Sequence, residues 1–294
     1  VLIETINAVF QMDEFLWELK DHIVGLNAGR WDYLFSYQKV YRNTKKVILP
    51  DRSKVNMFVP FMSNYNKLLV DTCHKRGAFG MGGMSAQVIA KSNPKEINEK
   101  ALAGVKKDKE RELNQGNDGA WVAHPSLVEP VKNIFEKNFK GPNQLNKFNN
   151  EKISRRNLLD EPKIDNAITE LGVRENLNEG IEYMAFWTIG TGCCVVNYLM
   201  ADAATCEVSR AQLWIWLRYK VKLNDGRTLD QKLIDKLIGE ELNKIKERFS
   251  AWRERTGDKS LDHVSFENAA KIFRNMITKD NFDDFLTLPL YENL

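Results

Sequence analysis

Short apolar segments alternate with longer helical patterns from the start of the chain to about Lys140. The segments that predict strands are short, apolar and bounded by turn residues: Val1–Thr5, Asn27–Ser36, Ala78–Met81 and Gly119–Ala123. The segments with helical spacing lie between or after them: Asp13–Ile23, Tyr65–Arg76, Glu96–Leu113 and Leu127–Phe139. A further apolar run, Val55–Pro60, brings the expected number of strands to four or five. Because strands alternate with helices, the pattern predicts βα units around a parallel sheet.

The predicted fold class is α/β, with the later part of a TIM (β/α)8 barrel. The candidate functional residues fall at the C-terminal ends of strands, and no GxGxxG turn follows a strand, which favours a barrel over a Rossmann fold. Eight strands close such a barrel, so the expected number falls short. The apolar opening Val1-Leu2-Ile3 has no initiator methionine and looks like the middle of a core strand. An upstream portion is therefore expected to be missing from this chain.

The pattern changes near Lys140. The stretch 141–160 carries glycine, proline, several asparagines and many charges, which is typical of a linker or an exposed loop. From Ile164 onward the spacing is helical almost to the end, with turns at Gly190–Gly192 and Asn224–Gly226. The predicted organisation is a barrel part at 1–140, a linker at 141–163 and an all-α C-terminal domain at 164–294.

Composition excludes several classes of protein. Hydrophobic residues make up 43% of the 294 residues, which is enough for an ordinary buried core. The net charge of +3 comes from interleaved basic and acidic residues, so no nucleic-acid partner is expected. No apolar run approaches the roughly 18 to 20 residues that span a membrane. The four cysteines form no CxxC pair, which favours a reducing, intracellular compartment.

One run of residues carries most of the functional information. Between Lys20 and Phe35 the sequence is KDHIVGLNAGRWDYLF, which resembles the signature of malate synthases. Three later segments resemble the same family in the same order: Met81–Met84, Asp118–Pro125 and Leu199–Arg210. The family condenses acetyl-CoA with glyoxylate and hydrolyses the thioester to malate and CoA, in the glyoxylate bypass of the tricarboxylic acid cycle. The resemblance implies an acyltransferase that takes these two substrates.

The resemblance implies that two acidic residues, Glu4 and Asp32, bind a catalytic Mg²⁺ ion. Glu4 ends the first predicted strand, and Asp32 lies on or just after the next one. Carboxylates at the C-terminal ends of neighbouring strands suit Mg²⁺, which keeps open positions for water and substrate oxygens. The bound ion would polarise the glyoxylate carbonyl. Without the family, Glu4 would suit a helix N-cap or a salt-bridge partner equally well.

The resemblance also implies that the turn formed by Gly29, Arg30, Trp31 and Asp32 binds glyoxylate through backbone N–H groups. Oriented amides bind anions well, and Gly29 lets the backbone approach closely. The alternative is that the aromatic side chains here only pack inside the barrel. For Tyr33 packing is the expected role.

Asp202 is the implied general base, which removes a methyl proton from acetyl-CoA. The thioester α-carbon is a weak acid, so a carboxylate must be held next to it while the developing enolate is stabilised. The small residues Ala201, Ala203 and Ala204 allow close approach. The alternative is that Asp202 caps a helix. The arginine that stabilises the enolate in this family is expected upstream of this chain, and Arg30 is not that residue.

The family lines the channel for the pantetheine arm of CoA with loop residues that match Met84, Trp121 and Pro125. A methionine or tryptophan at a strand end is also a common core residue, so both interpretations remain open.

Rival functions and arrangements also remain open. A related malyl-CoA or citramalyl-CoA lyase or thioesterase would share the barrel, the two acids and the use of CoA. An inactive partial chain that serves as an interaction module is the non-enzyme alternative, although the retention of Glu4, Asp32 and Asp202 argues against it. A fused isocitrate lyase would agree with the missing start. Because Tyr291–Leu294 is not an SKL-type signal, cytosol, mitochondrion and peroxisome are unresolved.

Overall fold

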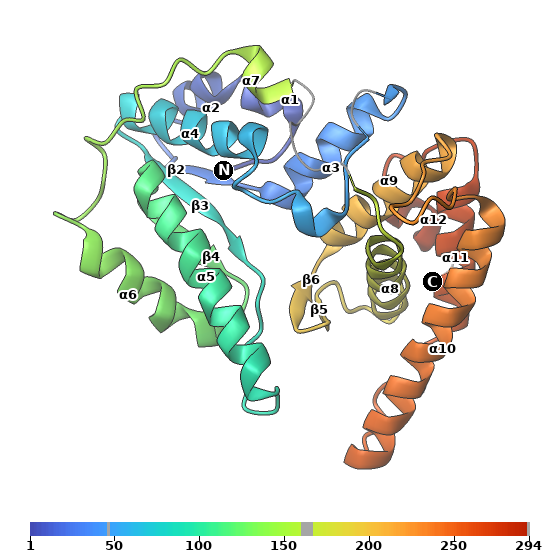
Figure 1. Cartoon of the computed structure of the whole chain (residues 1–294). Coiled ribbons are helices and arrows are strands. Elements are labelled where there is room, and N and C mark those ends of the chain that lie inside the picture. The colour runs from blue at the N-terminus through green and yellow to red at the C-terminus, as the bar shows by residue number, and fades with distance from the viewer. Residues whose placement is uncertain (46–47, 160–166, 293–294) are drawn as a thin grey trace. The chain divides into compact units, whose positions relative to one another are not determined.

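Four short strands in the first half of the chain form one parallel sheet in the order β1-β2-β3-β4 (Figure 1). The strands are β1 (Leu2–Ile3), β2 (Gly25–Ala28), β3 (Phe79–Ser85) and β4 (Gly119–Val122). Ile3 lies opposite Ala28, so β1 and β2 end at the same edge of the sheet. The computed structural model describes residues 1–45, 48–159 and 167–292, and no closed barrel is seen within these ranges.

The chain divides into two units. The first comprises Val1–Tyr37, Asn56–Lys163 and Asn197–Met200, and the second comprises Gln38–Val55, Ile164–Val196 and Ala201–Leu294. The parallel sheet belongs to the first unit. The predicted limits of the linker and the helical domain, at 163 and 164, lie outside the described residues, as do Asn293 and Leu294 of the C-terminal tetrapeptide.

Helices pack against the strands of the first unit. The helices of this part of the chain are α1 (Ile6–Val9), α2 (Met12–Glu18), α3 (Arg30–Tyr41), α4 (Pro60–Lys75), α5 (Lys95–Gln115), α6 (Val128–Asn138) and α7 (Arg155–Leu159), with the short 3-10 helix η3 (Pro125–Leu127). Helix α4 packs on β2 and β3. Its approach depends on Gly80, where an added Cβ would lie 3.1 Å from the Cα atom of Val70.

The predicted strand Asn27–Ser36 is wrong over most of its length. Strand β2 ends at Ala28, and helix α3 begins two residues later with the hydrogen bond from Tyr33 N to Gly29 O at 2.9 Å. Tyr33, Leu34 and Phe35 are all buried, so the run shows no helical period. A short continuous apolar run does not distinguish a buried strand from a buried helix, and the aromatic residues favoured the strand.

Smaller differences concern element ends. The predicted helix Asp13–Ile23 is shorter in the structure, because α2 ends at Glu18. The apolar run Val55–Pro60 forms no strand, and α4 begins at Pro60, five residues before the predicted start. Proline suits the first position of a helix because its missing N–H would have no intrahelical acceptor there.

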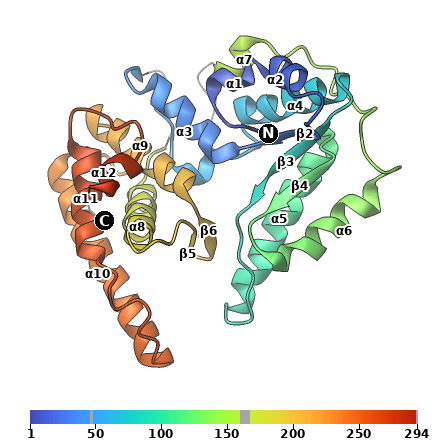
Figure 2. The same cartoon turned by 180° about the vertical axis from the view of Figure 1, so that it is seen from behind.

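The second unit is built mainly from helices, which can be followed in Figure 2. They are α8 (Glu170–Trp187), α9 (Ala203–Arg218), α10 (Gln231–Thr256), α11 (Phe266–Thr278) and α12 (Thr287–Tyr291), and the 3-10 helix η2 (Arg52–Lys54) also belongs to this unit. The core lies where α8 meets α9, α10 and α11. At Gly180 an added Cβ would lie 2.1 Å from Cζ of Phe273, so α8 and α11 approach closely because this residue has no side chain.

The predicted all-α character of the C-terminal part needs one correction. Two short strands, β5 (Cys194–Val196) and β6 (Leu199–Ala201), form a hairpin between α8 and α9. The two loop residues Asn197 and Tyr198 have φ values of 49° and 65°. A two-residue loop with two positive φ angles matches the twist of paired strands. Such a loop is usually recognised in a sequence by a glycine, and Asn197-Tyr198 has none. None of the helices in the described ranges is both long and apolar enough to cross a membrane.

Candidate functional site

Glu4 and Gly29 lie side by side at the C-terminal edge of the sheet. Glu4 directly follows Ile3 and Gly29 directly follows Ala28, and Ile3 and Ala28 lie opposite each other in the sheet. A Cβ added to Gly29 would stand 2.5 Å from both Cβ and Oε2 of Glu4. The Glu4 carboxylate therefore lies against the Gly29 backbone, in a space that any side chain at position 29 would fill.

Asp32 lies in the first turn of α3, three residues after Gly29. The predicted turn Gly29–Asp32 is thus the N-terminus of a helix. The first N–H groups of a helix have no intrahelical acceptor, and the helix dipole favours an anion at this end. The backbone of Arg30, Trp31 and Asp32 can therefore bind a small carboxylate.

Tyr65 on α4 lies within the electrostatic influence of both carboxylates, although no sequence pattern pointed to it. Its hydroxyl donates a hydrogen bond to the carbonyl oxygen of Ile3, and its ring stacks on Tyr33 at a centroid distance of 4.2 Å. Burial raises the pKa of Tyr65 well above its usual value, and Tyr33 and the negative charges of Glu4 and Asp32 raise it further, against a lowering by the Gly29 backbone. Tyr65 thus stays protonated and holds the end of β1. Tyr33 is fully buried and packs, as expected.

The donor set at this edge suits a hard divalent cation. Glu4 and Asp32 are both half-buried carboxylates that act on the same phenol. Across the described ranges, no group of three or more His, Cys, Asp and Glu side chains could enclose a metal ion. Two carboxylates with room for water and substrate oxygens is the arrangement that Mg²⁺ tolerates, whereas a structural zinc site would need more protein ligands.

The Arg30 side chain is bound by protein groups rather than left for a ligand. Its guanidinium donates to the carbonyl oxygen of Met84 and to Oδ2 of Asp108, the latter at 3.2 Å. Asp108 lies on α5 beside Lys109 and Arg111. Burial raises the pKa of Asp108, but the positive charges of Arg30, Lys109 and Arg111 outweigh it and hold the pKa well below its usual range.

Asp202 belongs to the second unit and caps α9. Its Oδ1 accepts a hydrogen bond from Thr205 N at 3.1 Å, and Asp202 N donates to the Thr205 hydroxyl at 3.1 Å, which makes a capping box. The alternative role expected for Asp202, a helix cap, is therefore present. Burial raises the pKa of Asp202, while the backbone amides of Thr205 and Ala204 lower it, and the balance is a raised pKa. A carboxylate whose pKa moves toward neutrality is better suited to accept a proton.

Two of the three residues expected along CoA are neighbours in the sheet. Met84 on β3 lies opposite Trp121 on β4, beyond a register shift that begins at Met81. Trp121 is 42% exposed. Pro125 is exposed and starts η3, whose N-cap is His124. The structure therefore places Met84 beside Trp121 and Pro125 in the next turn of chain.

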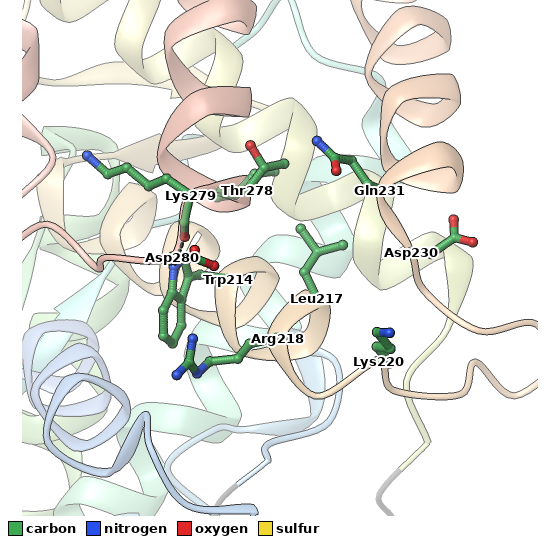
Figure 3. Close-up of a pocket in the computed structure, with 10 residues that line it drawn as sticks. Trp214, Leu217, Arg218, Lys220, Asp230, Gln231, Thr278, Lys279 and Asp280 are labelled. Carbon is green, nitrogen blue, oxygen red and sulfur yellow. Dashed lines mark hydrogen bonds between the residues drawn. The ribbon is translucent and has the colours of Figure 1, made fainter.

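The pocket shown in Figure 3 has a volume of about 300 Å³ and lies within the second unit. It is lined by the C-terminal end of α9, the N-terminal end of α10 and the C-terminal end of α11 with the residues after it. The Trp214 indole N–H in its wall already donates to the Lys279 carbonyl oxygen at 2.8 Å. None of the site residues expected from the sequence lines this pocket.

Comparison with known proteins gives two family matches that together cover most of the chain. The family model described as "Malate synthase, TIM barrel domain" matches residues 1–161, and the one described as "Malate synthase, C-terminal" matches residues 167–294. A malate synthase from Myxococcus xanthus is 44% identical over 100% of this chain and 53% of its own length. A glyoxysomal malate synthase from Candida tropicalis is 44% identical over 100% of this chain and 52% of its own length.

A third relative is a bifunctional glyoxylate cycle protein from Caenorhabditis elegans, 42% identical over 100% of this chain and 29% of its own length. This chain thus spans about half the length of the curated malate synthases that it matches. The solved structure of a citrate lyase from Burkholderia xenovorans LB400 aligns with 72% of this chain and 50% of its own at 14% identity. The TM-score of this alignment is 0.33.

Proposed function

This chain belongs to the malate synthase family, and on that premise we propose that it supplies the metal-binding and proton-abstracting parts of an enzyme that makes malate from acetyl-CoA and glyoxylate. The observation that carries the proposal is the contact of Glu4 with Gly29 at the paired ends of β1 and β2, with Asp32 in the turn that follows.

We propose that the sheet is the later part of a (β/α)8 barrel. Four parallel strands with helices between them agree with a family model that is described as a TIM barrel. The curated relatives are about twice as long as this chain, and the remaining strands and the enolate-stabilising arginine would correspond to the part of their length that this chain does not match. The bifunctional relative supports fusion to another glyoxylate cycle enzyme as an alternative arrangement.

Glu4 and Asp32 would hold Mg²⁺, and the fit rests on the two half-buried carboxylates and the space kept open by Gly29. When bound, the ion supplies Lewis-acid polarisation of the aldehyde carbonyl. The first N–H groups of α3 bind the glyoxylate carboxylate and orient the aldehyde. The stack of Tyr65 on Tyr33 and the hydrogen bond from Tyr65 to the Ile3 carbonyl oxygen keep the strand end in place.

Asp202 accepts the methyl proton of acetyl-CoA in this proposal. Its raised pKa, caused by burial, makes the carboxylate a stronger base than an exposed aspartate. Its cap hydrogen bonds with Thr205 fix the carboxylate on α9. The carbanion equivalent then attacks the glyoxylate aldehyde carbon, and water hydrolyses the thioester to release malate and CoA. Met84, Trp121 and Pro125 would contact the pantetheine arm.

The test measures free thiol released from acetyl-CoA with glyoxylate and Mg²⁺ present. The chain is assayed alone and together with the N-terminal half of a curated relative. We expect release that requires glyoxylate and Mg²⁺, appears with the added half and disappears when Asp202 is replaced by asparagine. Absence of release from a folded complex of both halves would refute the proposal. Cleavage of malyl-CoA to glyoxylate without hydrolysis would replace it with the lyase function.

A further inference from the structure

A cluster of buried charges lies under the C-terminal end of β3, and Arg30 is its one member that also belongs to the proposed substrate-binding turn. Five side chains form it, and they are Arg30, Asp108, Lys109, Arg111 and Glu112. The side chains of Lys109 and Glu112 are completely buried, and those of Arg30 and Asp108 are 16% and 14% exposed. Buried charges are expensive unless they are paired, so a cluster of three cations and two carboxylates needs a reason to exist.

The first half of the cluster forms hydrogen bonds with the backbone of β3. Lys109 Nζ donates to the carbonyl oxygen of Gly83 at 2.7 Å, and Glu112 Oε1 accepts from Gly83 N at 3.0 Å. Lys109 also pairs with Glu112 at 2.9 Å. A Cβ on Gly82 would stand 2.0 Å from Glu112 Oε2. Because Gly82 and Gly83 have no side chains, α5 can bind both the N–H and the carbonyl group of Gly83. Gly83 lies at the register shift between Met81 and Met84.

The second half of the cluster connects α5 with α3 and with the end of β3. Asp108 is held on α5 by Arg111 at 3.0 Å and by Lys109 at 3.4 Å. It binds Arg30, the first residue of α3, whose guanidinium also donates to the Met84 carbonyl oxygen. Arg30 thus joins three elements: α5 through Asp108, the end of β3 through Met84, and the first turn of α3 through its own backbone.

We propose that Asp108 is a positioning residue, which acts through Arg30 to hold the first turn of α3, and with it Asp32, in the geometry that binds the divalent cation and the small carboxylate substrate. This inference rests on the proposed function for the identity of the ligands. The link itself rests on the contacts of Arg30. Asp108 is bound to Arg30, Lys109 and Arg111, and its contribution is to set the direction in which α3 begins.

The principal variant is Asp108→Asn in the full chain. It keeps the size of the side chain but removes the charge that binds Arg30. Groups that orient metal ligands from behind typically change metal affinity by about 10- to 100-fold when they are replaced. We expect the dissociation constant for Mn²⁺, measured by the electron paramagnetic resonance of the free ion, to rise about tenfold or more. Backbone amides in residues 29–36 should exchange hydrogen faster, while those in α10 and α11 keep their rates.

Two controls separate positioning from general loss of stability. Glu110→Gln removes an exposed carboxylate from the same helix, paired with Lys106 at 3.8 Å, and should change neither measurement. His74→Gln removes a buried contact to Asp118 outside the charge cluster. It should lower the free energy of unfolding and leave Mn²⁺ affinity unchanged.

Two further variants keep the test decisive if Asp108→Asn does not fold. Arg30→Met removes the same ion pair but leaves Asp108 with Lys109 and Arg111, and it should raise the Mn²⁺ dissociation constant similarly. Asp108→Glu restores the charge and should recover most of the affinity. Wild-type affinity and wild-type exchange at the start of α3 in both Asp108→Asn and Arg30→Met would overturn the inference. If the wild-type chain binds no Mn²⁺, the metal part of the proposed function fails, and the exchange rates alone decide the positioning role.

Discussion

The two units hold their candidate acids by different kinds of contact. In the first unit, Glu4 is placed by the parallel pairing of β1 with β2 and by the missing side chain of Gly29, 25 residues further along the chain. In the second unit, Asp202 is placed by a hydrogen-bonded box with Thr205, only three residues away. Long-range packing fixes how two segments meet, whereas a cap fixes one carboxylate on its own helix. Substitutions in the two places should therefore fail in different ways.

The largest expected effect separates the two roles of Asp202. Asparagine caps a helix about as well as aspartate, so Asp202→Asn should keep the free energy of unfolding within a few tenths of a kcal/mol. A missing general base typically lowers the rate by about 10²- to 10⁴-fold. We expect thiol release to fall by that factor when the chain is assayed together with the N-terminal half of a curated relative. The measurements are a thiol assay and urea denaturation on the same preparation.

Asp230 provides the matched control for that variant. It caps α10 through a hydrogen bond from Leu233 N to Oδ1 at 2.8 Å, which is the same local contact without a proposed catalytic role. Asp230→Asn should change neither stability nor thiol release. Equal activity of Asp202→Asn and Asp230→Asn would reduce Asp202 to a helix cap.

The next effect is on stability and concerns the long-range contacts of the first unit. Lys109→Met leaves the buried Glu112 carboxylate and the Gly83 carbonyl oxygen without their shared partner. Breaking a buried ion pair by removing one member typically costs about 3–5 kcal/mol, and we expect a loss of that size in urea denaturation. Lys106→Met, on the exposed face of the same helix, should cost less than about 1 kcal/mol. A similar loss of unfolding free energy for both variants would show that the buried cluster stabilises the protein no more than the exposed ion pair does.

A smaller effect is expected where the first unit depends on a glycine. In Gly29→Ala, the added methyl group would meet Glu4 Oε2 at 2.5 Å, so the carboxylate or the turn must move. Overpacking of this kind typically costs about 1–3 kcal/mol, and Mn²⁺ binding should weaken at the same time. Gly104→Ala in α5 is the control, because the nearest atom to its added Cβ is 4.0 Å away. It should stabilise the protein by about 0.5–1 kcal/mol. Unchanged Mn²⁺ affinity in Gly29→Ala would contradict the assignment of this edge as the metal site.

The same division explains what the sequence could predict. Residues close together in sequence are enough to predict three features. These are the parallel βα pattern, the strand ends at Glu4 and at β4, and the helix cap formed by Asp202. The start of α3 was missed because consecutive buried aromatic residues show no period. The charge cluster of α5 was missed for a related reason: Lys109 and Glu112 have the spacing of an ordinary solvent-exposed pair, and only the fold buries them against Gly82 and Gly83.

The last prediction concerns the N-terminal end of β4, where His74 contacts both Asp118 and the chain after α6. His74 Nε2 lies 2.9 Å from Asp118 Oδ2, and Nδ1 lies 2.6 Å from the carbonyl oxygen of Lys147. Both oxygens only accept hydrogen bonds, so both ring nitrogens must donate and the imidazole is in its protonated, positively charged form. Burial lowers the pKa of His74, but the hydrogen bonds to Asp118 and Lys147 outweigh it and raise the pKa above its ordinary value of 6.5.

A raised folded-state pKa means that protonated His74 stabilises the fold most fully below the unfolded value. The contribution is lost as the pH rises through the folded pKa. The difference in unfolding free energy between wild type and His74→Gln should therefore be largest near pH 6 and shrink toward pH 9, as measured by urea denaturation. A difference that is constant with pH would mean that His74 stabilises the fold by packing. The charge of His74 would then contribute nothing to the long-range contacts of this unit. Because barrel enzymes carry function at the C-terminal ends of their strands and stability at the N-terminal ends, this pH dependence should appear in the unfolding free energy and leave Mn²⁺ affinity unchanged.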